Sequence, residues 1–85
     1  MQYTNLKDTV DLMLSNDYKD RFFAEYLQLK IRHDKLAYII EMYETRSLDF
    51  EPSCSPAFLK YQLSWMQGYM LALRTRAEIE KIDLE

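Results

Sequence analysis

The residues of this sequence that could do binding chemistry are tyrosines, arginines and lysines gathered near positions 20 and 75. Arginine and lysine side chains bind phosphate oxygens. Tyrosine rings stack on nucleobases, and their hydroxyls donate hydrogen bonds. Such residues would suit a small phosphate-bearing nucleotide, especially across a subunit boundary. The residues that we expect to bind this ligand are Tyr18, Arg21, Tyr26, Lys30, Arg74 and Arg76.

The same basic residues also have an ordinary structural explanation. Asp17, Glu25 and Asp34 lie within about two helical turns of Arg21 and Lys30, so these side chains could form exposed ion pairs with one another. Residue types alone leave both explanations open.

No pattern in the sequence predicts catalysis. His33 is expected among apolar neighbours, where a single polar residue can fix the register of packed helices. Cys54 has no histidine or basic residue beside it to activate the thiol. One cysteine and one histidine also make a poor metal-binding set. We therefore expect a protein that is not an enzyme and carries neither a metal nor a cofactor.

Composition excludes several other classes of protein. The chain has 85 residues, enough for one domain, and contains one glycine and two prolines. Because glycine supplies the left-handed conformations of tight hairpins and phosphate loops, its scarcity disfavours β folds, P-loops and dinucleotide-binding turns. The 11 basic and 14 acidic residues give a net charge of -3, which argues against binding to a DNA or RNA duplex.

The sequence also favours a cytoplasmic protein. A lone cysteine cannot form an intramolecular disulfide, which suits a reducing compartment. No apolar run approaches the roughly 18 residues of a membrane span, and no signal-peptide core follows Met1.

Apolar spacing predicts an all-α fold. Helices are expected at residues 5–14, 17–46 and 56–81, with a loop at 47–55, in a single domain of residues 1–85. The two long helices each carry an apolar seam with alternating spacings of three and four residues. A nine-residue connection between them predicts an antiparallel hairpin, with the short first helix beside it.

Both long helices have more apolar surface than one seam can bury. In the third helix, Phe58, Tyr61, Trp65 and Gly68 form a second face with its own helical spacing. Exposed apolar patches of this kind mark interfaces, and a glycine would let another helix approach closely. We therefore expect a homo-oligomeric helical bundle with these four residues at the interface. The second helix has off-seam apolar residues that the first helix would partly cover, namely Phe23, Leu27, Ile31, Tyr38 and Ile39.

Two parts of the chain resemble a family of small bacteriophage proteins related to a protein of a crAss-like phage. The first part is the stretch from Tyr18 to Arg32, followed by Lys35-Leu36. The resemblance covers about residues 17–84 and leaves the first helix as an addition. Its second part consists of Leu48, Phe50, Pro52, Cys54, Leu59, Gln62, Met66, Tyr69, Leu73, Arg76-Ala77 and Ile79-Glu80.

The hairpin layout is similar to that of phage anti-CBASS and anti-Thoeris sponges, which sequester cyclic nucleotide signals or relatives of cyclic ADP-ribose as oligomers. This resemblance implies a non-catalytic anti-defence protein that sequesters a cyclic nucleotide immune signal in the infected cell. An alternative is a helical adaptor that docks a host or phage protein through Phe58, Tyr61 and Trp65. A purely structural oligomer is a third possibility, and the sequence leaves all three open.

Overall fold

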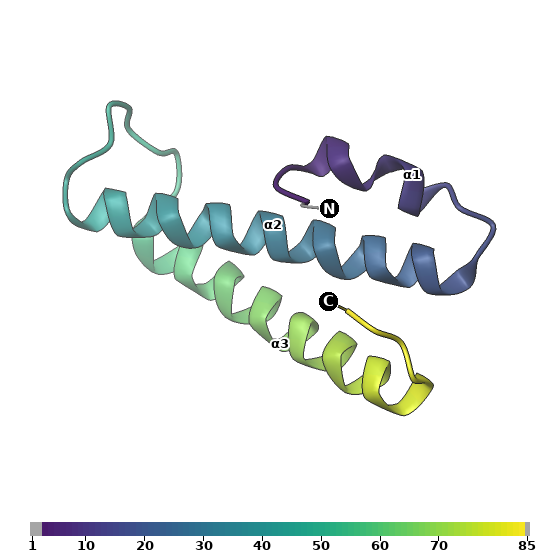
Figure 1. Ribbon diagram of the computed structural model, residues 1–85. Coiled ribbons are helices and arrows are strands. Elements are labelled where there is room, and N and C mark those ends of the chain that lie inside the picture. Colours follow the sequence, from purple (N-terminus) through teal and green to yellow (C-terminus); the bar gives the residue numbers. More distant parts are fainter. Residues whose placement is uncertain (1–2, 85) are drawn as a thin grey trace.

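The computed structural model describes residues 3–84, and within that range every regular element is a helix. The two long helices lie side by side, and the N-terminal elements lie along the first half of one of them (Figure 1). The molecule is elongated, with extents of 43 × 24 × 18 Å. The prediction of an all-helical protein is confirmed. In chain order the elements are the 3₁₀ turn η1 (Leu6–Thr9), α1 (Val10–Met13), α2 (Tyr18–Glu44) and α3 (Pro56–Glu80).

The first predicted helix is divided into η1 and α1. Asn5 and Asp8 form a capping box, in which the Asn5 side chain accepts from the Asp8 amide and the Asp8 carboxylate accepts from the Asn5 amide. Thr9 then donates its hydroxyl proton to the Leu6 carbonyl at 2.7 Å. This bond spans three residues, so it suits the tighter 3₁₀ turn rather than one continuous α-helix.

Helix α2 begins at Tyr18, one residue after the expected start, and ends at Glu44. The Asp17 side chain caps its start by accepting from the Lys19 amide at 2.9 Å. At the other end, Arg46 takes a left-handed conformation with φ 59°, and the Ser47 amide donates to the Met42 carbonyl at 2.8 Å. Chain reversal at Arg46 therefore stops the helix at Glu44 rather than at residue 46.

Helix α3 is bounded by two clear signals. Ser55 caps its start by accepting from the Phe58 amide at 3.2 Å, and Pro56 occupies the first helical position. Lys81 ends it in a left-handed conformation with φ 61°, and the Ile82 amide donates to the Ala77 carbonyl at 2.8 Å. This reversal turns Ile82 into the core.

The contacts between α2 and α3 pair the start of each helix with the end of the other. Tyr18 donates a hydrogen bond to Glu80 at one end, whereas Lys60 forms an ion pair with Glu44 at the other. Between them, Leu73 is the most deeply buried large side chain of the core, at 2% exposure. The buried core cluster consists of Phe22, Tyr26, Met70, Leu73, Ala77 and Ile82.

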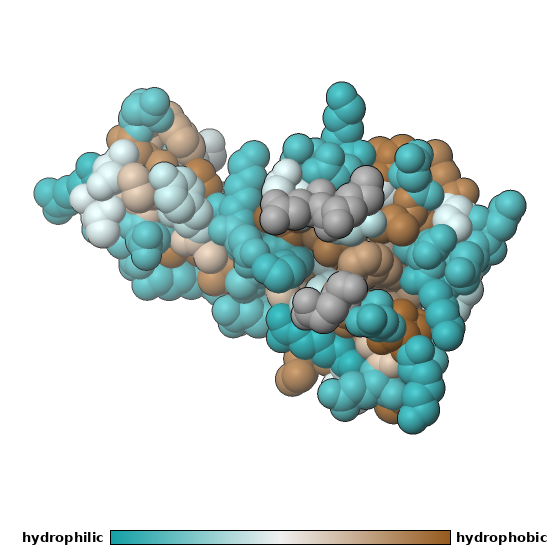
Figure 2. Space-filling model, viewed as in Figure 1, coloured by the Kyte–Doolittle hydropathy of each residue, from teal (hydrophilic) through white to brown (hydrophobic). Residues whose placement is uncertain are grey.

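Burial is unequal along the molecule. We call residues 3–30 and 70–84 the core end, and residues 31–69 the loop end. Among the described residues, Ile40 is the only buried residue of the loop end, and all other buried residues belong to the core end. Apolar side chains reach the surface at the loop end (Figure 2). None of the described helices is both long and apolar enough to cross a membrane.

A candidate ligand-binding groove

An open groove of about 1410 Å³ lies beside the middle part of α2. Its lining comes from three separate parts of the chain: residues 3–7, α2 between Phe23 and Tyr38, and Leu84 of the C-terminal tail. A single helix is convex and cannot form such a space. The groove therefore exists because the first and last described residues both return to α2.

The N-terminal wall of the groove is held by a small set of polar and aromatic contacts. Thr9 is fully buried, and its hydroxyl oxygen accepts a hydrogen bond from the Gln28 amide at 2.9 Å. The Tyr3 ring packs edge-on against Phe23, with ring centroids 5.5 Å apart. Hydrogen bonds from the backbone of Thr4 and Asn5 lower the pKa of Asp8, which keeps the capping carboxylate ionised.

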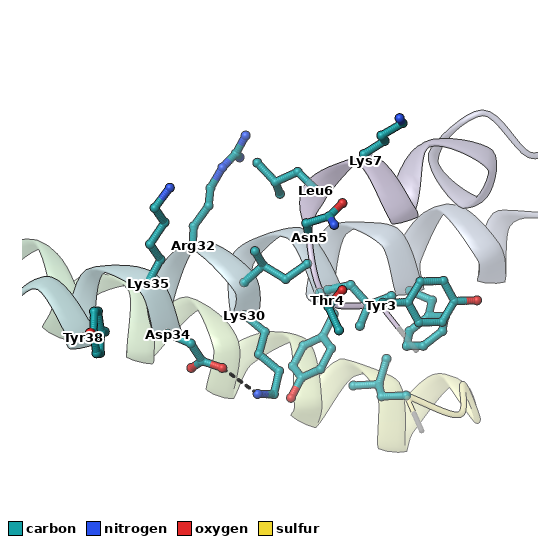
Figure 3. A pocket seen from close by; sticks show the side chains of 15 residues that line it. Tyr3, Thr4, Asn5, Leu6, Lys7, Lys30, Arg32, Asp34, Lys35 and Tyr38 are labelled. Carbon is teal, nitrogen blue, oxygen red and sulfur yellow. Dashed lines mark hydrogen bonds and ion pairs between the residues drawn. The ribbon is translucent and has the colours of Figure 1, made fainter. Parts of the chain in front are cut away.

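Positive charge dominates the groove. Lys7, Lys30, Arg32 and Lys35 line it together with one carboxylate, that of Asp34. Lys7, Arg32 and Lys35 extend to one side, away from the pair formed by Lys30 and Asp34 (Figure 3). Within residues 3–84, none of these three side chains forms an ion pair. The groove thus presents uncompensated cations, which is the electrostatic requirement for an anionic ligand.

Among the groove cations, Lys30 is the one that forms an ion pair with another described residue. Its ammonium group lies 2.8 Å from the Asp34 carboxylate, and this hydrogen bond raises the Lys30 pKa. Burial opposes ionisation of Asp34, but hydrogen bonds from Lys30 and His33 lower its pKa overall. Both groups are therefore charged at neutral pH, and a ligand anion would compete with Asp34 for Lys30.

Aromatic rings supply the second type of surface in the groove. Tyr3, Phe23, Tyr26 and Tyr38 all contribute to the lining. Tyr38 is 59% exposed, whereas Tyr26 is only 7% exposed and belongs to the core. A flat ligand ring could therefore stack on Tyr38, while Tyr26 offers its edge and hydroxyl.

The Tyr26 hydroxyl connects the groove to α3. It accepts a hydrogen bond from Arg74 Nε at 3.1 Å, and the Arg74 guanidinium lies 5.7 Å from the ring centroid. Because the hydroxyl accepts here, its own proton is free to be donated. Arg74 also forms no ion pair within residues 3–84, so its charge adds to that of the groove.

The remaining residues of the sequence-based hypothesis lie elsewhere on the core end. Tyr18 donates to Glu80 at 2.8 Å and accepts from Arg76 at 2.6 Å, while Arg76 also bonds Glu80 at 3.0 Å. The hydrogen bonds that Tyr18 and Arg76 each form with Glu80 raise the pKa of Tyr18 and of Arg76. The same two hydrogen bonds lower the pKa of Glu80. Arg76 is therefore already neutralised by a carboxylate.

Arg21 is separate from both groups. It donates to the Ser15 carbonyl at 2.8 Å, in the connection between α1 and α2. Of the six predicted ligand residues, the structure thus places Tyr26 and Lys30 in the groove and Arg74 next to it. It places the other three outside the groove lining.

Sequence reasoning missed several groove residues. Tyr3, Lys7 and Lys35 were not among the expected ligand residues, because nothing local ties the chain start to the middle of α2. One signal was available in the sequence. The off-seam apolar residues Phe23 and Ile31 required a cover, and the N-terminal segment supplies it.

His33 has a polar partner next to it in the sequence. Its Nδ1 atom lies 2.9 Å from the Asp34 carboxylate, while its Nε2 atom is buried and has no hydrogen-bond partner in the part of the chain that the structure describes. The side chain is 16% exposed, so most of its surface is buried. No group of three or more potential metal ligands occurs within residues 3–84.

These features define a small helical protein with a basic, partly aromatic groove. The sequence model of the Sequestin family matches residues 16–79, which include all of α2 and almost all of α3. The chain therefore belongs to the Sequestin family, whose name denotes sequestration of a ligand. No curated protein and no solved structure matches the chain. Residues 3–7 and Leu84 lie outside the matched range, so the groove combines family and non-family elements.

Proposed function

We propose that this protein is a non-catalytic bacteriophage anti-defence protein that binds and sequesters a cyclic nucleotide immune signal of the host. The observation that carries the proposal is the groove, where four cations and one carboxylate share the lining with aromatic rings. A cyclic nucleotide combines the matching features, an anionic phosphate and a flat base. Membership of the Sequestin family supports retention of a ligand without turnover.

The groove suggests a role for each type of residue. Arg32 and Lys35 hold the phosphate, because neither has an ion-pair partner within residues 3–84. Tyr38 stacks on the base, and the Tyr26 hydroxyl donates a hydrogen bond to the ligand. A sponge acts by mass action, so it needs a dissociation constant of about 1 μM or lower, which corresponds to about -8 kcal/mol.

The protein acts as a homo-oligomer in the cytoplasm. The crosswise contacts of α2 and α3 make an antiparallel hairpin the proposed repeating unit of a homo-oligomer in the cytoplasm of the infected cell. Exposed aromatic side chains on α3 support such assembly, since a single chain leaves them in water.

A second candidate function rests on the same exposed side chains. Phe58, Tyr61 and Trp65 are 59%, 57% and 66% exposed, and these rings could dock a host or phage protein instead. In that case the protein would be a helical adaptor, and the groove would not need to bind a nucleotide.

One experiment separates these functions. The purified chain is incubated with cyclic mononucleotides, cyclic dinucleotides and cyclic ADP-ribose, and thermal unfolding and retained ligand are measured. Binding by a sponge should stabilise the protein by about 2.7 kcal/mol when free ligand is at 100 times the dissociation constant. If no compound shifts the melting temperature at 100 μM, the cyclic nucleotide proposal fails.

A pair of charge-matched variants assigns any binding to the groove. Arg32→Ala/Lys35→Ala should abolish ligand retention, because it removes both unpaired cations that we assign to the phosphate. Lys19→Ala/Lys60→Ala removes the same charge from outside the groove lining and should retain the ligand. Equal losses in both variants would indicate a general charge effect and would contradict the proposed site.

A further inference from the structure

One face of α3 changes from large to small side chains along its length. Phe58, Tyr61, Trp65, Gly68 and Ala72 follow spacings of three and four residues, so they form one stripe on the helix. All five are exposed. The three rings form a continuous ladder, with centroid separations of 5.9 Å and 6.1 Å. The stripe is therefore bulky in its first half and nearly flat in its second half.

Gly68 makes room for no other group among the described residues of its own chain. A Cβ atom built at this position would meet nothing within 4 Å. Its backbone conformation is helical and needs no glycine, and glycine weakens a helix interior relative to alanine. Its lack of a side chain is therefore useful only to a neighbour outside the chain.

The stripe also lacks the charge that would select an oppositely charged partner. Between residues 56 and 73, Lys60 is the only charged residue, and it pairs with Glu44 of the same chain. Two identical copies of such a face meet without electrostatic repulsion, which favours a second copy of this chain as the occupant.

We propose that two copies pack α3 against α3 in an antiparallel arrangement, about a two-fold axis at Trp65. Residues equally far from Trp65 then face each other, so Phe58 lies on the partner's Ala72 and Tyr61 lies beside the partner's Gly68. On either side of the axis the large side chains of one copy meet the small side chains of the other, which allows close packing there, while the two Trp65 rings pack against each other at the axis. A parallel arrangement would instead oppose ring with ring and leave a gap at Gly68.

This contact rests on the homo-oligomer of the proposed function, but its test requires no nucleotide. Cys54 is exposed and free, so a Cys54→Ser chain provides a background without thiols. In that background, the Phe58→Cys/Ala72→Cys double variant should form a covalent dimer on mild oxidation. Residues 58 and 72 are about 21 Å apart along one helix, so a disulfide cannot form between them within a chain.

The single variants report the direction of the two helices. Phe58→Cys alone and Ala72→Cys alone should remain uncrosslinked, because each thiol would lie far from its copy across the axis. Trp65→Cys alone should crosslink, because this position meets itself. Crosslinking of Phe58→Cys alone would show a parallel contact and would overturn the proposal.

A non-covalent readout avoids relying on introduced thiols. Gly68→Leu should raise the dimer dissociation constant at least tenfold in sedimentation analysis, while helix content is maintained. Gln67→Leu, on an exposed position away from the stripe, should leave the constant unchanged. A monomeric wild-type chain at 100 μM, or equal effects of the two variants, would overturn the proposal. Nucleotide binding by a monomer would leave the sponge function intact, and a dimer without nucleotide binding would leave this contact intact.

Discussion

The core end and the loop end use the same two helices, α2 and α3, yet they differ in almost every structural property. At the core end, the N-terminal segment and the C-terminal tail add a third layer, and the described residues there contain nearly all of the buried side chains. Toward the connecting loop, α2 and α3 lose this third layer, and Phe58, Tyr61 and Trp65 remain exposed. Two packed helices bury only one apolar stripe each. Any further apolar surface needs a third layer, which either another segment of the chain or a partner molecule can supply.

This comparison assigns different tasks to the two ends. The core end has its own packing and supplies most of the groove lining, which continues onto the adjoining turns of α2 through Arg32, Lys35 and Tyr38. The described residues supply no cover for the aromatic stripe of the loop end, and a second copy is the cover that we propose for it.

The largest effect should come from matched truncations on the α3 seam. Leu73→Ala removes a side chain that is 2% exposed, and it should reduce the free energy of unfolding by about 3 kcal/mol. Leu63→Ala, on the half-buried seam of the loop end, should cost about 1 kcal/mol. Chemical denaturation at low protein concentration measures both. Equal losses would show that the two ends are equally well packed.

An intermediate effect is expected where the N-terminal segment joins α2. Thr9→Val keeps the shape of a fully buried side chain but removes its hydrogen bonds to Leu6 and Gln28. The loss should be about 1–2 kcal/mol, because the Leu6 carbonyl and the Gln28 amide each lose the hydrogen bond that they form with the buried Thr9 hydroxyl. Thr75→Val makes the same change at an exposed position and should alter stability by less than about 0.5 kcal/mol. If the two variants behave alike, Thr9 does not anchor the groove wall.

The smallest effect should be a gain in stability when glycine replaces Lys81 or Arg46, the two residues with a left-handed backbone conformation. Lys81→Gly should raise the free energy of unfolding by about 0.5–1 kcal/mol, because glycine adopts φ 61° without a steric penalty. Arg46→Gly relieves the same penalty at φ 59°, but at the loop end. If the loop end opens locally before global unfolding, Arg46→Gly will mainly slow amide hydrogen exchange near residue 46 and will change the global free energy of unfolding less. A larger global gain from Arg46→Gly than from Lys81→Gly would reverse the proposed order of stability.

Much of the fold could be predicted from residue patterns. The caps Asp17 and Ser55, together with Pro56, fix where the long helices begin, because their side chains or ring act within one turn. The division of the first helix could not be predicted with the same rules. It depends on the Thr9 hydroxyl, which satisfies the Leu6 carbonyl and Gln28 together only after the segment has packed on α2.

The candidate site was predictable only in part. Tyr26, Lys30 and Arg74 belong to the aromatic and basic cluster of the sequence, and they lie in or next to the groove. Arg76 belongs to the same cluster, but Glu80 neutralises it four residues later in α3. Residue types identify cations, whereas only geometry shows which of them already have a carboxylate.

The sequence by itself determined the helical class, the seams and the surplus aromatic stripe, because these depend on spacings of three and four residues and on the near absence of glycine. Only the tertiary structure decided which surplus surface is covered and where the groove lies. The N-terminal segment and Leu84 reach α2 from opposite ends of the chain, and contacts of such long sequence separation are set by packing rather than by local preference. The same physical reason leaves the stripe at Trp65 exposed, because no segment within residues 3–84 covers it.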